Sequence, residues 1–341
     1  MKASQWRSLA ILYFPVALVS LWGEGSTHAT AEEARTAREV LDHTMLLISA
    51  VILMCYHSST LARAQTFLDY LLTYVRDLKK IHKGVTYNGN HHMALHLYDF
   101  VLLYGPVRGW WTFPFERLIG HLQRLPQNHH FTHLHVTLSR AFIRGGKLKR
   151  LLASSRCPDI LRQCKGVFDR AFGVNDRHGS SNPAIPAVKA SRKKQRTPDD
   201  LKTLIQSDRV SLQARFRYKG CSFTRASTHT GNSLIEFYPN GPGSSTSPVV
   251  GSISYIYDTL NGSTFFAVRR QLQIPSSIPD PFRHYPHFPA KLYSCQLSDT
   301  LETVRPEWVI GHVARWQMTP REVVIVFLSR VSVDLVLLSQ C

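Results

Sequence analysis

Acidic side chains are scarce in this chain. Its 341 residues contain 23 Asp and Glu against 41 Lys and Arg, a formal net charge of +18 that leaves out 17 His. An excess of this size is typical of proteins that bind polyanions, either nucleic acid or an anionic membrane surface. It is also compatible with a basic protein that binds neither. Wholesale disorder is excluded, because 44% of the residues are apolar and 11% are aromatic.

Cysteine is also scarce, and its spacing excludes a disulfide scaffold. The six Cys, at positions 55, 157, 164, 221, 295 and 341, form neither a CxxC pair nor a dense framework. A reducing compartment is the simplest interpretation. The sequence also has no internal repeat.

No apolar run is long enough to cross a bilayer. The run at 9–22 follows Lys2 and Arg7 and precedes Ala29-Thr30-Ala31, which is the pattern of a secretory signal with its cleavage site. Pro15 in mid-run argues against a signal. Two interpretations stay open: a secreted or membrane-attached protein, or a buried element of an intracellular domain.

Apolar periodicity predicts helices through the first half of the chain. They are expected at 31–57, with a buried second half, from a Thr60 cap to Lys79-Lys80, at 91–104, from Pro114, at 131–144 and at 147–153. Gly145-Gly146 separates the last two.

The second half changes character. Residues 171–210 are rich in Ser, Pro and Lys or Arg, which predicts an exposed basic linker. Alternation with a period of two predicts strands at 212–218, 233–238, 249–257, 264–270, 308–313 and 322–329. The expected fold class is α+β, with a helical domain at 1–170, the linker at 171–210, and a small β-barrel or sandwich-like domain at 211–334.

Candidate chemistry is concentrated between residues 90 and 124. His92 and His96 are four residues apart, so on one helix both imidazoles share a face and are able to hold a metal, although two His form only half of a tetrahedral site. Glu116 near a helix start suits either the helix dipole or Mg²⁺ coordination in phosphoryl transfer.

This stretch resembles a known family. Residues 90–97, 105–107 and 110–120, the last reading Trp-Trp-Thr-Phe-Pro-Phe-Glu-Arg-Leu-Ile-Gly, resemble the domain of unknown function that follows the catalytic core of En/Spm-type (CACTA) transposases of basidiomycete fungi. The resemblance extends to the opening, at 3–7 and 14–23, and to the tail, at 265–270, 280–282, 285–286 and 308–312.

The resemblance implies descent from RNase H-like DD(E) recombinases. Their zinc site combines a Cys pair with a His pair, and their last catalytic carboxylate follows the second His. Here His92 and His96 match the His half, and Glu116, 20 residues beyond His96, matches the carboxylate. The ancestral metals are Mg²⁺ and Zn²⁺.

The departures from the family decide the expected function. The Cys pair and both catalytic Asp of the family belong upstream of the matched opening, and one Glu does not hold two metals. The acids before Glu116 lie mostly on predicted helices: Glu24, Glu32, Glu33, Glu39, Asp42, Asp69, Asp77 and Asp99. We therefore expect a truncated, transposon-derived fragment that is not an enzyme and requires no cofactor. The alternative is an active metal-dependent transposase or nuclease subunit completed in trans.

The distribution of positive charge along the chain indicates the expected binding partner. Between Gly105 and Arg170 there are 12 Lys or Arg and 3 acids, which predicts sequence-independent DNA binding through phosphates. The candidate contacts are Arg117, Arg124, Arg140, Arg144, Lys147, Lys149 and Arg150. A transposase catalytic domain is a second possible partner. A nuclear location and no small-molecule substrate are expected.

Overall fold

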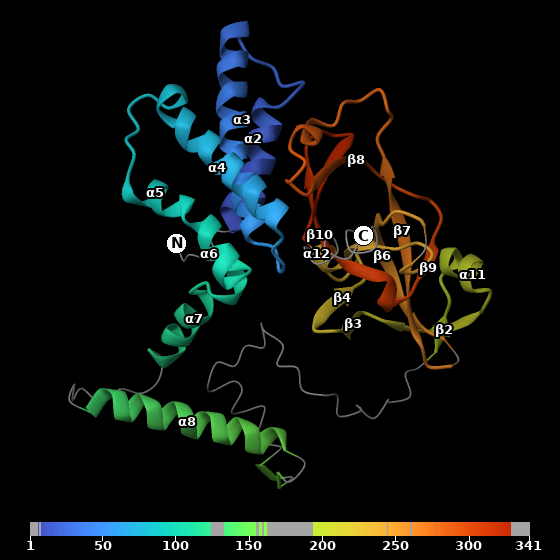
Figure 1. Cartoon of the computed structure of the whole chain (residues 1–341). Helices are drawn as coiled ribbons and strands as arrows, with labels where there is room; N and C mark the ends of the chain where they lie inside the picture. The colour runs from blue at the N-terminus through green and yellow to red at the C-terminus, as the bar shows by residue number, and fades with distance from the viewer. Residues whose placement is uncertain are drawn as a thin grey trace. The chain divides into compact units, whose positions relative to one another are not determined.

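The structure is a computed structural model of the chain (Figure 1). It describes residues 8–123, 133–154, 194–243, 245–259 and 261–328, together with residues 6, 157–158 and 160–161. Two compact units are distinguished, residues 1–110 with 192–341 and residues 111–191. The second unit interrupts the first in sequence, so the first is built from two distant parts of the chain.

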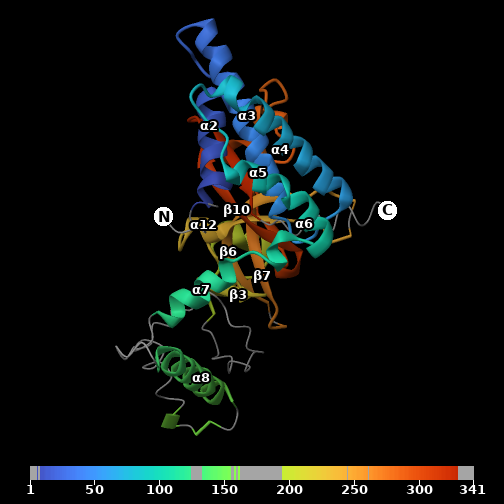
Figure 2. The same cartoon turned by 60° about the vertical axis from the view of Figure 1, so that its left-hand side comes forward.

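The first unit opens with helices. They are the π-helix η1 (Leu9–Tyr13) and the α-helices α2 (Phe14–Trp22), α3 (Ala31–Met54) and α4 (Leu61–Ile81). α4 begins at the predicted cap, where the Thr60 hydroxyl oxygen accepts a hydrogen bond from the Arg63 N–H at 3.2 Å. The second half of α3 is buried as predicted, through Leu41, Met45 and Ile52. α2, α3 and α4 lie side by side (Figure 2).

The signal-like run forms η1 and α2 in this helical layer. Val16 and Val19 are buried, whereas Phe14 and Leu21 on the other side of α2 are exposed. Among the described residues, no helix combines the length and the apolar character that crossing a membrane requires.

The helix predicted at 91–104 is interrupted. α5 (Gly89–Leu95) begins at Asn88, whose side chain accepts from the His91 N–H at 3.2 Å while His91 Nδ1 accepts from the Asn88 N–H at 3.2 Å. At His96 the backbone N–H bonds to the Ala94 carbonyl instead of continuing the i−4 pattern, and α6 (Leu97–Tyr104) then starts. The prediction of one helix carrying both His92 and His96 was therefore wrong.

The second unit contains α7 (Phe113–Leu122) and α8 (Leu134–Ala153). The sequence predicted a break at Gly145-Gly146, but α8 is continuous through both glycines. Each Gly costs a helix about 1 kcal/mol relative to Ala. The helix continues through the pair because the neighbouring Leu, Arg and Lys residues are good helix formers.

The rest of the first unit is mostly sheet. Its strands are β1 (Gln195–Arg196), β2 (Arg209–Gln213), β3 (Arg215–Tyr218), β4 (Cys221–Thr224), β5 (Leu234–Phe237), β6 (Val249–Asp258), β7 (Thr264–Gln273), β8 (Ala290–Leu297), β9 (Glu302–Val304), β10 (Val309–Gln317) and β11 (Glu322–Phe327). Nine of these form an antiparallel sheet in the order β1-β2-β6-β5-β10-β11-β8-β7-β9, with an additional β6–β7 pairing, and β3 pairs with β4 alone. The expected combination of N-terminal helices and a C-terminal β-rich region is confirmed.

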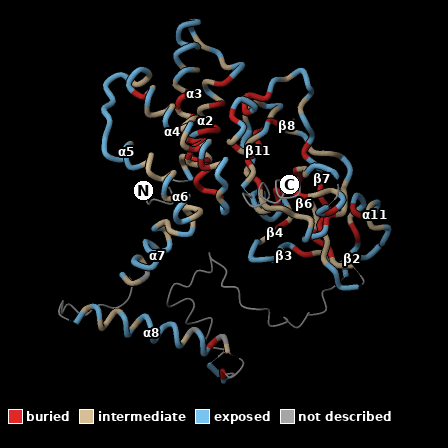
Figure 3. Tube along the Cα trace, in the orientation of Figure 1, coloured by how far each residue is buried: buried red, intermediate tan, exposed pale blue. Residues whose placement is uncertain are grey.

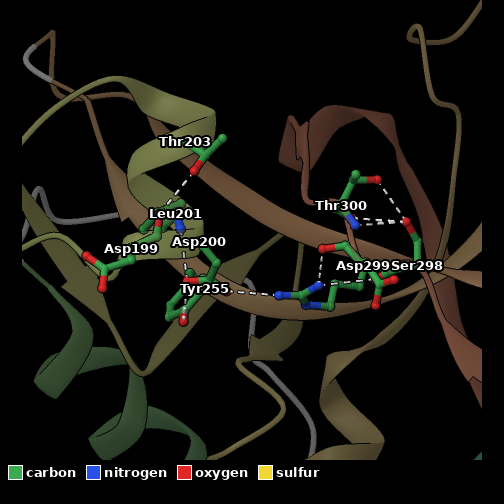
Figure 4. Close-up of polar contacts among 9 residues, drawn as sticks. Asp199, Asp200, Leu201, Thr203, Tyr255, Ser298, Asp299 and Thr300 are labelled. Carbon is green, nitrogen blue, oxygen red and sulfur yellow. Dashed lines mark hydrogen bonds and ion pairs between the residues drawn. The ribbon is translucent and has the colours of Figure 1, made fainter.

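The described end of the predicted linker is folded. Residues 195–196 form β1 against β2, and α11 (Asp199–Ile205) buries Leu201 beneath it. Asp200 fixes α11 to the sheet, because its carboxylate accepts from the Tyr255 hydroxyl at 3.0 Å and pairs with Arg269 at 3.0 Å (Figure 4). Residues 171–193 of the predicted linker and 329–334 of the predicted β-rich domain lie outside the described residues.

Helices and sheet of the first unit share a core. Leu41, Met45 and Phe67 belong to one buried cluster with Phe282, Phe288, Leu292 and Val324. The Tyr285 hydroxyl donates to Asp42 Oδ1 at 2.7 Å, and burial with this bond raises the pKa of Tyr285. The helices up to residue 104 are therefore packed as one body with the sheet.

A buried histidine joins α3 to α4. His43 Nε2 donates to the Tyr74 carbonyl at 2.8 Å, which leaves Nδ1 to accept from His82 Nε2 at 3.2 Å. The His43 ring also stacks on Tyr74 with a centroid distance of 4.4 Å. Burial lowers the pKa of His43, so the folded state holds this imidazole neutral.

We predict that acid destabilises the fold through His43. A histidine whose pKa is lower in the folded than in the unfolded protein binds more protons when unfolded. Stability is then complete above the unfolded pKa of about 6.5 and is lost as the pH falls below it. The urea midpoint should fall between pH 7.5 and 5.5, and it should fall less in His43→Gln. An unchanged pH dependence in His43→Gln, with the exposed His135→Gln as control, would contradict this account.

Candidate nucleic-acid interface

α8 contains most of the predicted DNA-binding residues. Arg140, Arg144 and Lys147 are spaced by four and three residues, so they project from one side of the helix. All three are exposed, as is Arg150 in the last turn. Exposed and intermediate residues make up most of α8 (Figure 3). The helix contains no Asp or Glu, and its 20 residues span about 30 Å. One side of α8 therefore bears a positive stripe, with the exposed Ile143 and Leu151 beside it.

The other side of α8 is apolar. The apolar residues here are spaced by three, four or seven residues, and they are half-buried or, at Leu152, buried: Leu134, Leu138, Ala141, Leu148 and Leu152. The exposed Arg140, Arg144 and Lys147 thus lie apart from the less exposed positions of α8. Because these cations are exposed, they are available to an external anion.

The remaining predicted DNA contacts are only partly described. Arg117 lies on α7 and Lys149 on α8, and the structure describes their backbone without their side chains. Arg124 lies outside the described residues.

The two candidate zinc ligands do approach one another despite the interrupted helix. His92 Nε2 and His96 Nε2 are 3.2 Å apart, and the rings meet edge to face with centroids 4.8 Å apart. Asp99, three residues further on, lies 3.6 Å from the other nitrogen of His96, Nδ1. Asp99 is therefore placed to pair with a protonated His96. Its spacing of three residues from His96 on a helix is a signal that the sequence contains.

These residues do not make a complete zinc site. A structural zinc ion takes four protein ligands, and two imidazole nitrogens supply half of them. Because Asp99 contacts Nδ1, its position is that of an outer partner of a ligating histidine. Among the described residues, no group of three or more His, Cys, Asp or Glu is arranged to hold a metal.

We predict that zinc binds weakly at His92 and His96. Water would have to complete the coordination shell, and open two-ligand sites lose metal readily during dialysis. Elemental analysis after dialysis should find well under one zinc per chain. One zinc per chain that disappears in His96→Ala but persists in the exposed His135→Ala would show that other residues complete the site.

Glu116 occupies the first turn of α7 and is exposed. The Thr112 hydroxyl donates to its Oε1 at 3.4 Å, and the Glu116 N–H bonds to the Thr112 carbonyl at 2.9 Å. These contacts suit a carboxylate that stabilises a helix N-terminus. Glu116 belongs to the 111–191 unit, and the two histidines belong to the other unit.

Comparison of the chain with protein-family models, with curated proteins and with solved structures finds no match.

Proposed function

We propose that this chain is a transposon-derived protein that binds DNA through the phosphate backbone, independently of sequence, and has no catalytic activity of its own. The observation that supports DNA binding is the positive stripe of α8: exposed Arg140, Arg144, Lys147 and Arg150 on a helix without a single acid. Arg and Lys contacts to phosphates release condensed counterions, which drives binding without reading bases.

A transposase origin is supported by the resemblance of residues 90–120 to the CACTA family. His92 and His96 retain the His half of the family's zinc site, and Glu116 retains its last carboxylate. We propose the nucleus as the location and a transposase catalytic domain as a second partner, because a protein of this descent acts on chromosomal DNA together with such a domain.

We also propose that the sheet closes into a small barrel. β6 pairs with β5 and with β7, and β5, β10, β11, β8 and β7 are paired in that order, which supports a circuit of six strands. A closed circuit removes the free edges at which sheets aggregate. An experimental structure in which β7 and β8 are unpaired would contradict closure.

We predict a steep salt dependence of DNA binding that depends on α8. The logarithm of the affinity for duplex DNA falls by about 0.9 per phosphate contact for each tenfold rise in salt. Replacing Arg140, Arg144 and Lys147 by Gln should therefore lower that slope by about two to three units. The measurement is fluorescence anisotropy with a labelled duplex of arbitrary sequence over a salt series, and circular dichroism verifies that each variant is folded.

A matched control removes the same charge elsewhere. Arg283, Lys291 and Arg321 are exposed cations of the first unit, and their combined replacement by Gln should change the slope by less than one unit. DNA binding that is undetectable at low salt, or equal effects of the two triple variants, would contradict the α8 assignment.

We predict that the purified chain does not nick supercoiled plasmid in the presence of Mg²⁺ or Mn²⁺. Two-metal phosphoryl transfer requires several carboxylates around the metals, and Glu116 alone matches the family's catalytic set. Metal-dependent nicking that is lost in Glu116→Gln, but retained in the exposed Glu32→Gln, would show that this carboxylate works with acids not identified here.

A further inference from the structure

A second basic surface lies on the β3–β4 hairpin. Arg215 and Arg217 alternate along β3 with Phe216 and Tyr218, so the cations project from one face and the aromatic rings from the other. Arg215, Arg217 and Lys219 are exposed. Phe216 packs edge to face on Phe266 of the sheet core, with ring centroids 5.9 Å apart. The two arginines of β3 are therefore exposed, while the aromatic side chains of the same strand pack against the sheet core.

The turn of the hairpin holds a lysine in a backbone conformation that is unfavourable for stability. Lys219 and Gly220 form the two-residue turn, and both have positive φ, +45° and +80°. Turns of this kind prefer Asn, Asp or Gly at both positions, because other residues are strained there. Lysine occupies the strained position nonetheless, which adds a third cation at the turn, with its Nζ 5.3 Å from the centroid of the Tyr218 ring.

No internal anion neutralises this surface. From Arg209 to Ile235 the sequence contains five Lys or Arg and no Asp or Glu. Within the described part of the chain, no ion pair includes Arg215, Arg217 or Lys219. Cations two residues apart on a strand are separated by about 6.8 Å, a spacing suited to successive phosphates of one nucleic-acid strand.

We infer that the β3–β4 hairpin is a second phosphate-binding surface, whose three cations contact the backbone of duplex DNA. The inference rests on the proposed function and extends it to a second unit of the chain. Nucleic acid is favoured over an anionic bilayer, because membrane-bound elements insert aromatic or aliphatic side chains beside their cations. Here Phe216 and Tyr218 face the protein core instead.

The test measures duplex binding by the full chain over a salt series. The variant Arg215→Gln/Arg217→Gln/Lys219→Gln should lower the salt slope by about two to three units and weaken binding at 0.1 M salt at least about tenfold. The control Arg283→Gln/Lys291→Gln/Arg321→Gln removes equal charge from other exposed sites of the same unit and should change the slope by less than one unit.

A single substitution separates lost contacts from misfolding. Lys219→Gly removes one cation and also relieves the positive φ, so its melting temperature should equal or exceed that of the wild type while its affinity for DNA falls. Weaker binding by a more stable protein does not arise from unfolding.

The outcomes distinguish this inference from the proposed function. If the wild type binds DNA and the hairpin variant behaves like the control, the hairpin inference is overturned and the function assigned to α8 stands. If the wild type does not bind at low salt, both are overturned. Hairpin-dependent binding to phosphatidylserine vesicles in the absence of DNA binding would assign the surface to a membrane and also overturn the inference.

Discussion

The packing of α3 against the sheet joins two parts of the chain that are far apart in sequence. The Tyr285 hydroxyl reaches Asp42 across a sequence separation of 243 residues, beside a shared core of Leu41, Phe282 and Leu292. Closing so long a loop costs conformational entropy, and burial of apolar side chains along this contact offsets that cost. The unit at 111–191 lies within this loop in the sequence.

Charge imposes the second constraint. With 23 acids for 41 cations, one-to-one pairing would leave 18 cations without a carboxylate partner. Several acids are committed to local pairs: Asp77 contacts Arg76 and Lys80, and Glu302 contacts Arg270. α8 and the β3–β4 hairpin contain no acids at all, so their positive charge is not cancelled locally. On both surfaces the cations lie on a different side of the element from the less exposed apolar residues. On α8 this follows from cations spaced by three and four residues, and on β3 it follows from the alternation of cations with aromatic residues.

Local signals predicted the elements that depend on local interactions. The Thr60 cap, the buried half of α3 and the positions of most strands follow from side chains within a few residues of each other. The same reasoning failed at residue 96, where competing hydrogen bonds end one helix and begin another. It also failed at Gly145-Gly146, where the helix continues because its flanking residues outweigh two poor helix formers.

The sequence by itself determined the charge excess, the alternation of β3 and the acid-free composition of α8, because composition and periodicity are properties of the chain alone. Only the tertiary structure decided that the first helices share a core with the sheet and that Lys219 occupies a left-handed turn. Each of these depends on where backbone and side chains meet after folding, which no spacing along the sequence specifies.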